Sequence, residues 1–129
     1  MLYAILCYDS ESVVGSWSKE EDDRAIAKLE VVEQKWQKQG RLGPVARLMP
    51  TKSAVTLRKG QKAVLMDGPF AETKEVLLGF FIVECATREE AIEAARELGQ
   101  ASSTQGSYEI RPLMLFKPGG NVAQTSESD

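Results

Sequence analysis

Short apolar runs recur along the chain, each rich in strand-forming residues and bounded by turn-prone ones. They predict strands at residues 2–8, 42–49, 54–58, 62–66, 77–85 and 108–116. The third and fourth runs flank Lys59-Gly60-Gln61, which is typical of the turn of a β-hairpin. The run at 77–85 has the strongest strand character of the six.

Two longer stretches carry apolar residues three and four positions apart, the spacing of one face of a helix. Each stretch begins with a Ser or Thr that is followed three residues later by Glu, a capping box, and each ends at a glycine. The boundary residues are Ser18, Glu21 and Gly40 for the first helix and Thr87, Glu90 and Gly99 for the second. The inward-facing residues are Ala25, Leu29, Val32 and Trp36 in the first helix and Ala91, Ala94, Ala95 and Leu98 in the second.

The order of the predicted elements is strand, helix, strand, hairpin, strand, helix, strand. This order predicts an α+β fold, a ferredoxin-like sandwich in which an antiparallel sheet carries two helices on one face and an inserted β-hairpin. The domain is expected to span residues 1–116. A polar C-terminal tail is expected at residues 117–129, where Pro, Gly, Ser, Glu and Asp are frequent.

Both faces of the predicted sheet are apolar. In the run at 77–85, one face carries Leu78, Phe80 and Ile82, and the other carries Leu77, Gly79, Phe81, Val83 and Cys85. Two helices cover only one face, and a large exposed apolar patch is unusual on a monomer. A homodimer packed through the second sheet face is therefore predicted.

The composition narrows the chemistry that the chain can perform. It contains no histidine, which excludes Ser-His-Asp and Cys-His nucleophile systems, imidazole metal ligands and a histidine general base. Neither a metal nor a cofactor is predicted. The net charge of −3 indicates no general attraction to nucleic acid or to a membrane surface.

The two cysteines and the amino terminus bear on location. Cys7 and Cys85 lie in apolar runs without CxxC spacing, which favours buried free thiols in a reducing compartment. The apolar start of the chain lacks the features of a signal peptide, and no run has the length of a membrane helix. A cytoplasmic location is expected.

A basic segment surrounds the predicted hairpin. Residues 41–62 contain no acidic side chain and carry six basic ones, Arg41, Arg47, Lys52, Arg58, Lys59 and Lys62. Such a segment either binds an anionic ligand or an acidic partner, or protects exposed strand edges from pairing with other chains. It has no interleaved aromatic residues, which argues against binding to nucleic acid.

The turn Asp67-Gly68-Pro69-Phe70 is the most distinctive segment of the sequence. A rigid turn explains these residues, since Asp67 can accept hydrogen bonds from nearby amides and Phe70 can pack back as an anchor. A carboxylate on a stiff turn beside a cleft is also how an acid–base group would be held, and Glu72 adds a second carboxylate.

Two further residues are candidates for ligand binding. Arg111 lies on the face of its strand opposite Ile110, where it either pairs with Glu109 or binds the carboxylate of a ligand. Tyr8 is an aromatic residue whose phenol can reach a polar cleft.

The run 67–75, followed by Gly79-Phe80-Phe81 and Glu109-Ile110-Arg111-Pro112, resembles the DGPF-domain branch of the YCII-related proteins. The resemblance extends over residues 1–116 and implies a ferredoxin-like fold in a dimeric α+β barrel. Some relatives are proposed to use a His–Asp pair, which this chain cannot form. DGPF-domain proteins are often associated with extracytoplasmic-function sigma factors, which implies a regulatory partner.

Two functions follow from these features. The first is a small-ligand-binding or regulatory homodimer, with a small anionic ligand and a sigma factor as expected partners. The alternative is a lyase, isomerase or hydrolase-like enzyme that uses Asp67 as acid–base at the dimer cleft and Arg111 to hold its substrate. The expected ligand-binding residues are Arg111, Tyr8, Gly68, Pro69, Phe70 and Glu72.

Overall fold

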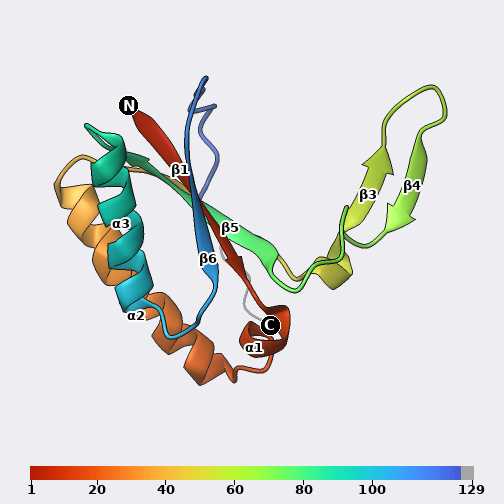
Figure 1. The fold of residues 1–129 in the computed structure, drawn as a ribbon, viewed down its shortest axis with the longest axis horizontal. Coiled ribbons are helices and arrows are strands. Elements are labelled where there is room, and N and C mark those ends of the chain that lie inside the picture. Colours follow the sequence, from red (N-terminus) through yellow and green to blue (C-terminus); the bar gives the residue numbers. More distant parts are fainter. Residues whose placement is uncertain (126–129) are drawn as a thin grey trace.

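The computed structural model describes residues 1–125 and contains two antiparallel sheets and a set of helices (Figure 1). The strands are β1 (Leu2–Asp9), β2 (Leu42–Arg47), β3 (Val55–Arg58), β4 (Val64–Asp67), β5 (Val76–Glu84) and β6 (Ser107–Pro112). The helices are α1 (Glu11–Val14), α2 (Lys19–Lys38), the 3₁₀ turn η1 (Thr51–Ser53) and α3 (Arg88–Ala101). Residues 126–129 of the predicted tail lie outside the described residues.

The main sheet has the strand order β2-β5-β1-β6, and every neighbouring pair is antiparallel. With α2 and α3 on one face, this arrangement confirms the predicted ferredoxin-like α+β fold. Strands β3 and β4 pair only with each other, and they confirm the inserted hairpin. Figure 1 shows this hairpin projecting away from the sheet and helices.

The core lies between the main sheet and the two long helices. Ile5, Val83, Trp36 and Leu98 are fully buried there, and α3 turns its predicted inward residues Ala91, Ala94, Ala95 and Leu98 to the sheet. The Trp36 and Phe81 rings meet edge to face, with centroids 6.3 Å apart. No helix in residues 1–125 has the length and apolarity needed to cross a membrane.

The ends of α2 match the prediction. Ser18 Oγ accepts a hydrogen bond from the Glu21 amide (3.1 Å), and the Glu21 carboxylate accepts one from the Ser18 amide (2.9 Å). Gly40 adopts a left-handed φ of 69° just after the helix, as a helix-terminating glycine does. The local sequence therefore fixes both ends of this helix.

The predicted end of α3 is wrong. The helix continues through Gly99 to Ala101, and the chain leaves the helix at Ser102, which is extended. Gly99 is not among the glycines with positive φ, so it lacks the conformation that stops a helix. At the other end, Thr87 Oγ1 accepts a hydrogen bond from the Glu90 amide, as predicted. The Glu90 carboxylate accepts a hydrogen bond from the Ala86 amide and not from the Thr87 amide that a capping box requires.

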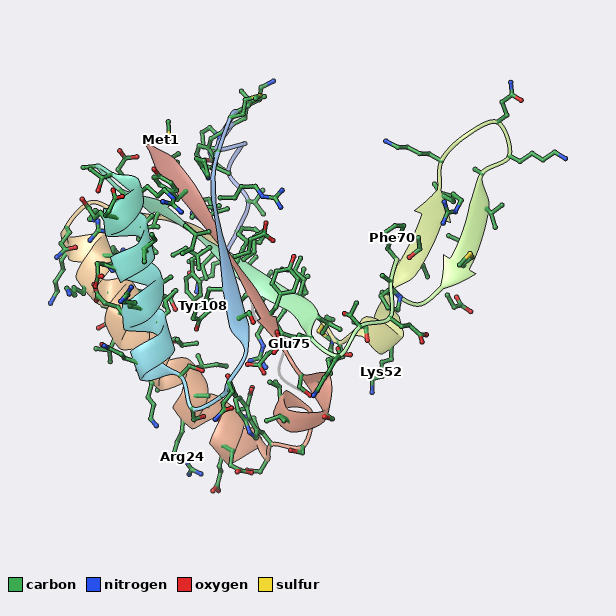
Figure 2. The ribbon with its side chains drawn as sticks, in the orientation of Figure 1. Met1, Arg24, Lys52, Phe70, Glu75 and Tyr108 are labelled. Carbon is green, nitrogen blue, oxygen red and sulfur yellow. The ribbon has the colours of Figure 1, made fainter. Side chains whose placement is uncertain are left out.

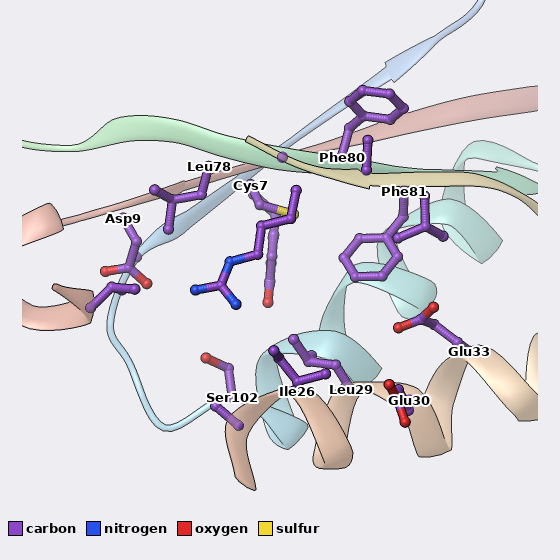
Figure 3. A pocket seen from close by; sticks show the side chains of 18 of the residues that line it. Cys7, Asp9, Ile26, Leu29, Glu30, Glu33, Leu78, Phe80, Phe81 and Ser102 are labelled. Atoms are coloured by element: carbon purple, nitrogen blue, oxygen red, sulfur yellow. The ribbon is translucent and has the colours of Figure 1, made fainter. Parts of the chain in front are cut away.

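The pairing of β1 with β5 contains an irregularity that changes which side chains face the helices. Cys7 pairs with Gly79, whereas Tyr8 pairs with Leu77, so Leu78 is the extra residue of a bulge. Figure 3 shows Leu78 on the helix side of the sheet with Cys7, while Phe80 points to the other side. The predicted grouping of Leu78 with Phe80 is therefore wrong, because regular alternation does not continue through a bulge.

The sheet face turned away from the helices, called the open face below, is built around Ala4, Leu6, Phe80 and Ile82, with Glu109 and Arg111 on the adjoining strand. Ala4 and Ile82 are buried within the single chain, while Leu6 and Phe80 are half-buried. This face is thus less exposed than the alternating pattern predicts.

Strands β2 and β5 approach each other closely at Gly79. A Cβ atom at this position would lie 2.2 Å from the carbonyl oxygen of Ala46 on β2. Only glycine fits this contact without a shift of the backbone. The strand that carries Arg47 is thereby held tightly against β5.

Candidate functional site

A cleft of about 1060 Å³ lies between α2 and the main sheet (Figure 3). Ile26 and Leu29 of α2 form one wall, and Cys7, Leu78 and Phe81 of the sheet form the other. The cleft exists because α2 is fully buried only at Trp36, near its carboxyl end, whereas Ala25, Ile26 and Leu29 are only half-buried. A volume of this size accommodates a small organic molecule.

An ion pair links the helix to the sheet beside the cleft. Both carboxylate oxygens of Asp22 on α2 accept hydrogen bonds from the Arg47 guanidinium on β2, at 2.8 and 3.1 Å. This two-point geometry fixes the orientation of both side chains. Because the Asp22 carboxylate pairs with the Arg47 guanidinium, the positive charge of Arg47 is already neutralised.

The remaining charged groups of the cleft are acidic. Asp9 lies at one end, and Glu30 and Glu33 line the α2 side (Figure 3). Burial and the neighbouring Glu30 carboxylate raise the pKa of Glu33. The cleft is therefore apolar with a negative rim, which favours neutral or positively charged groups and disfavours anions.

The nucleophilic side chains of the cleft are held in their neutral forms. Burial raises the pKa of the Cys7 thiol to about 12. Burial, followed by the electrostatic influence of Cys7 and Asp9, raises the pKa of Tyr108 to about 12. A thiol that stays protonated is a weak nucleophile. Neither the Cys7 thiol nor the Tyr108 phenol is therefore activated as a nucleophile in this cleft.

The structure places the predicted turn on the projecting hairpin, apart from this cleft. Asp67 ends β4 and is exposed, and it is absent from the cleft lining. Gly68 has a φ of 99°, its amide donates to the Ala54 carbonyl (2.8 Å), and its carbonyl accepts from Thr56 Oγ1 (2.9 Å). Among residues 1–125, no hydrogen bond engages the Asp67 carboxylate.

The neighbours of Asp67 are also largely solvent-facing. Phe70 is 80% exposed, so the prediction that it packs back as an anchor is wrong (Figure 2). Pro69 is half-buried, and Glu72 is exposed. Two hydrogen bonds, from the Gly68 amide to the Ala54 carbonyl and from Thr56 Oγ1 to the Gly68 carbonyl, therefore hold the turn without help from Phe70.

Arg111 and Tyr8 lie on the main sheet. The Arg111 guanidinium pairs with Glu109, as the simpler of the two sequence interpretations predicts. The hydrogen bond and charge of Glu109, with a small contribution from Tyr8, raise the pKa of Arg111. Tyr8 also lines the cleft, whereas Arg111 does not. The structure thus brings Tyr8 near Arg111 but leaves Asp67 distant from both within one chain.

The family model of the YCII-related domain matches residues 1–117. The chain belongs to the YCII-related family. An uncharacterized protein, R00369 of Rhizobium meliloti (strain 1021), is 56% identical over 120 residues, which cover 92% of this chain and 97% of that protein. Membership of the family agrees with the resemblance carried by the run 67–75.

The basic segment of this YCII-domain protein divides into two parts. Arg41 donates to the Glu84 carbonyl (3.0 Å) and pairs with Glu90 (3.2 Å), and Arg47 pairs with Asp22, so both hold the domain together. The other four basic residues lie on the hairpin or near its base and are exposed, namely Lys52, Arg58, Lys59 and Lys62. The predicted single patch is therefore partly structural.

Sequence reasoning missed the cleft residues of the YCII domain. Asp22 falls in an acidic run that suits the amino end of any helix, and Asp9 follows a strand where a turn is expected. No spacing in the sequence connects Asp22 with Arg47. Their proximity depends on how α2 lies across the sheet.

Proposed function

We propose that this YCII-domain protein is a homodimeric small-ligand-binding protein with a regulatory role, and that its ligand occupies the cleft between α2 and the sheet. The observation that carries this proposal is the cleft itself, about 1060 Å³ with aliphatic and aromatic walls and carboxylates at its rim. The Cys7 thiol, which burial keeps protonated, supplies no activated nucleophile in the cleft.

The charges of the cleft define the ligand that fits it. An anionic ligand, which the sequence predicts, would approach the carboxylates of Asp9, Glu30 and Glu33 while Arg47 is already paired. A molecule with an apolar body and a neutral or cationic polar group meets no such repulsion. Arg111 lies outside the cleft and is itself paired with Glu109.

Three probes that share one ring system test this function: 1-naphthylmethylamine, 1-naphthalenemethanol and 1-naphthoate. A ligand that binds only the folded state raises stability by RT ln(1 + [L]/Kd), about 2.7 kcal/mol at a hundredfold excess over Kd. We expect the amine and the alcohol to raise the melting temperature of the protein and the carboxylate to have no effect.

A matched pair of variants locates the binding. Leu29→Trp fills the cleft and should abolish the stabilisation by the probes. Val31→Trp replaces a side chain of the same helix that is 67% exposed, and it should preserve the stabilisation. The proposed cleft function fails if none of the probes stabilises the wild type, or if Leu29→Trp binds them as the wild type does.

The homodimer is proposed to pack through the open face, where Leu6 and Phe80 are only half-buried in a single chain. The regulatory partner implied by the DGPF resemblance is a sigma factor. A pull-down from an extract of the native organism tests this partner, with the Leu29→Trp variant as a comparison. We expect the wild type to recover a sigma factor.

One observation favours an enzyme as the second candidate function. The Asp67 carboxylate stands on a stiff turn with no hydrogen bond to residues 1–125, so it is available to act as acid–base if a partner subunit supplies the rest of a site. A substrate screen of the wild type against Asp67→Asn tests this candidate, because turnover that survives the substitution excludes Asp67 as the base.

A further inference from the structure

The hairpin of β3 and β4, called the arm below and comprising residues 55–67, extends beyond the domain (Figure 1). Five of its apolar side chains are exposed, namely Val55, Leu57, Val64, Leu65 and Met66. Leu57 pairs with Leu65 on one face, and Thr56 pairs with Met66 on the other, so both faces carry uncovered apolar groups.

The arm has little support within its own chain. Neither strand pairs with another strand of residues 1–125, so both outer edges are open. A two-stranded hairpin by itself is at best marginally stable in water. Open edges and exposed apolar side chains together also promote unwanted association. A surface of this kind is stable and soluble when a specific partner covers it.

We propose that the arm of each protomer packs on the domain of a second copy of this chain, so that two copies exchange arms in the dimer. This inference rests on the dimeric part of the proposed function and adds the element that holds the dimer together. A two-fold axis makes the two arm contacts identical and closes the assembly at two subunits.

The area of the open face supports this role for the arm. A stable interface buries roughly 800 Å² on each partner. Ala4 and Ile82, at the centre of the open face, are each only 7% exposed in the single chain, so they add almost nothing to a new interface. The centre of the open face therefore offers little apolar area, and the five exposed apolar side chains of the arm offer more.

Charge also favours arm-to-domain contact over contact between two arms. The arm carries Arg58, Lys59, Lys62 and Asp67, a net charge of +2, so the chain's net charge of −3 leaves −5 on the rest of the molecule. Among residues 1–125, none of the three basic arm residues takes part in an ion pair. Two arms repel each other, whereas an arm and a partner's domain attract.

Sedimentation equilibrium of the full chain tests the proposal with the double variant Leu57→Ser/Leu65→Ser. These two side chains are directly paired and are 61% and 66% exposed, so their replacement leaves the domain core intact. Because the dimer loses four buried leucines, we expect its dissociation constant to rise at least about 100-fold. The control Val31→Ser, also at an exposed apolar site, should leave it unchanged.

A cross-linking measurement locates the contact. Cys7 and Cys85 are shielded, so Leu65→Cys provides one reactive thiol for a maleimide–benzophenone reagent. We expect cross-links between protomers, from the arm to residues outside the arm of the partner. Links only within one chain, or only between two arms, contradict arm exchange.

The remaining outcomes separate this inference from the proposed function. A dimer that is unchanged in Leu57→Ser/Leu65→Ser but dissociates in Phe80→Ser overturns the role of the arm and leaves the dimer. A wild type that is monomeric at 100 µM in roughly physiological salt overturns both arm exchange and the dimer, and leaves the cleft to be judged by the naphthyl probes. A monomer that binds phosphatidylglycerol vesicles through the arm identifies a membrane-binding element and also overturns arm exchange.

Discussion

The substitution Gly99→Ala distinguishes two accounts of how α3 ends. If Gly99 terminated the helix in a left-handed conformation, alanine would be strained there and would destabilise the protein by about 1 kcal/mol. In the structure Gly99 is helical and lies before Ala101, where alanine is favoured over glycine by up to about 1 kcal/mol. Because Gly99 lies in the last turn of the helix, we expect a stabilisation of about 0.5 kcal/mol.

The surroundings of Gly99 leave room for the added methyl group. A Cβ atom there would lie 3.8 Å from Cε2 of Tyr108, an ordinary van der Waals distance. Gly79→Ala is the opposite case, because its Cβ would lie 2.2 Å from the Ala46 carbonyl oxygen and the backbone of β2 would have to move. We expect that second substitution to cost about 1–3 kcal/mol.

Urea denaturation followed by circular dichroism measures both effects. With a slope of about 1–3 kcal/mol/M for a protein of this size, Gly99→Ala should raise the midpoint by roughly 0.2–0.5 M. Gly79→Ala should lower it. A Gly99→Ala variant that is less stable than the wild type by about 1 kcal/mol would restore the helix-terminating role predicted from sequence and refute the conformation described above.

Three further predictions concern the cleft. The raised pKa of Glu33 means that the folded state binds the Glu33 proton more tightly than the unfolded state does, so ionisation of Glu33 destabilises the fold as pH rises. Glu33→Gln should therefore be more stable than the wild type at pH 7, and urea titrations should show this difference shrinking toward pH 4. The Cys7 thiol, with a pKa of about 12, should react with Ellman's reagent at pH 8 only after unfolding. Cys85 should behave in the same way because it is buried, and rapid labelling of the native protein would contradict the burial of the thiols. A double-mutant cycle of Asp22→Asn and Arg47→Met should give a coupling energy of about 0.5–1 kcal/mol, because the pair is bidentate but partly exposed, and a coupling near zero would mean that the pair does not hold α2 to β2 in solution.

The sequence predicts the elements whose signals are local. Ser18, Glu21 and Gly40 define α2 because capping hydrogen bonds and a left-handed glycine involve only neighbouring residues. The inward face of α3 follows from helical spacing, and Leu98 is fully buried there. These features are independent of how the helices lie on the sheet.

The candidate site depends on tertiary placement, which the sequence does not encode locally. The Asp22–Arg47 pair joins two elements, and the bulge at Leu78 arises from the pairing of β1 with β5. The predicted Asp67 turn is a real local motif, but its distance from the cleft follows from the direction in which the arm leaves the sheet. Turn chemistry therefore identified the segment as a turn and could not locate it relative to the cleft.

The strand order β2-β5-β1-β6 has a consequence for synthesis of the chain. Ile5 of β1, which precedes both of its partner strands in the chain, pairs with Phe81 on one side and Ile110 on the other. The apolar β1 therefore has no partner strand until β5 has been synthesised, and its pairing closes long loops, which slows folding. Overexpression at low temperature or with a chaperone should accordingly improve the soluble yield of this protein more than that of a helical protein of the same length.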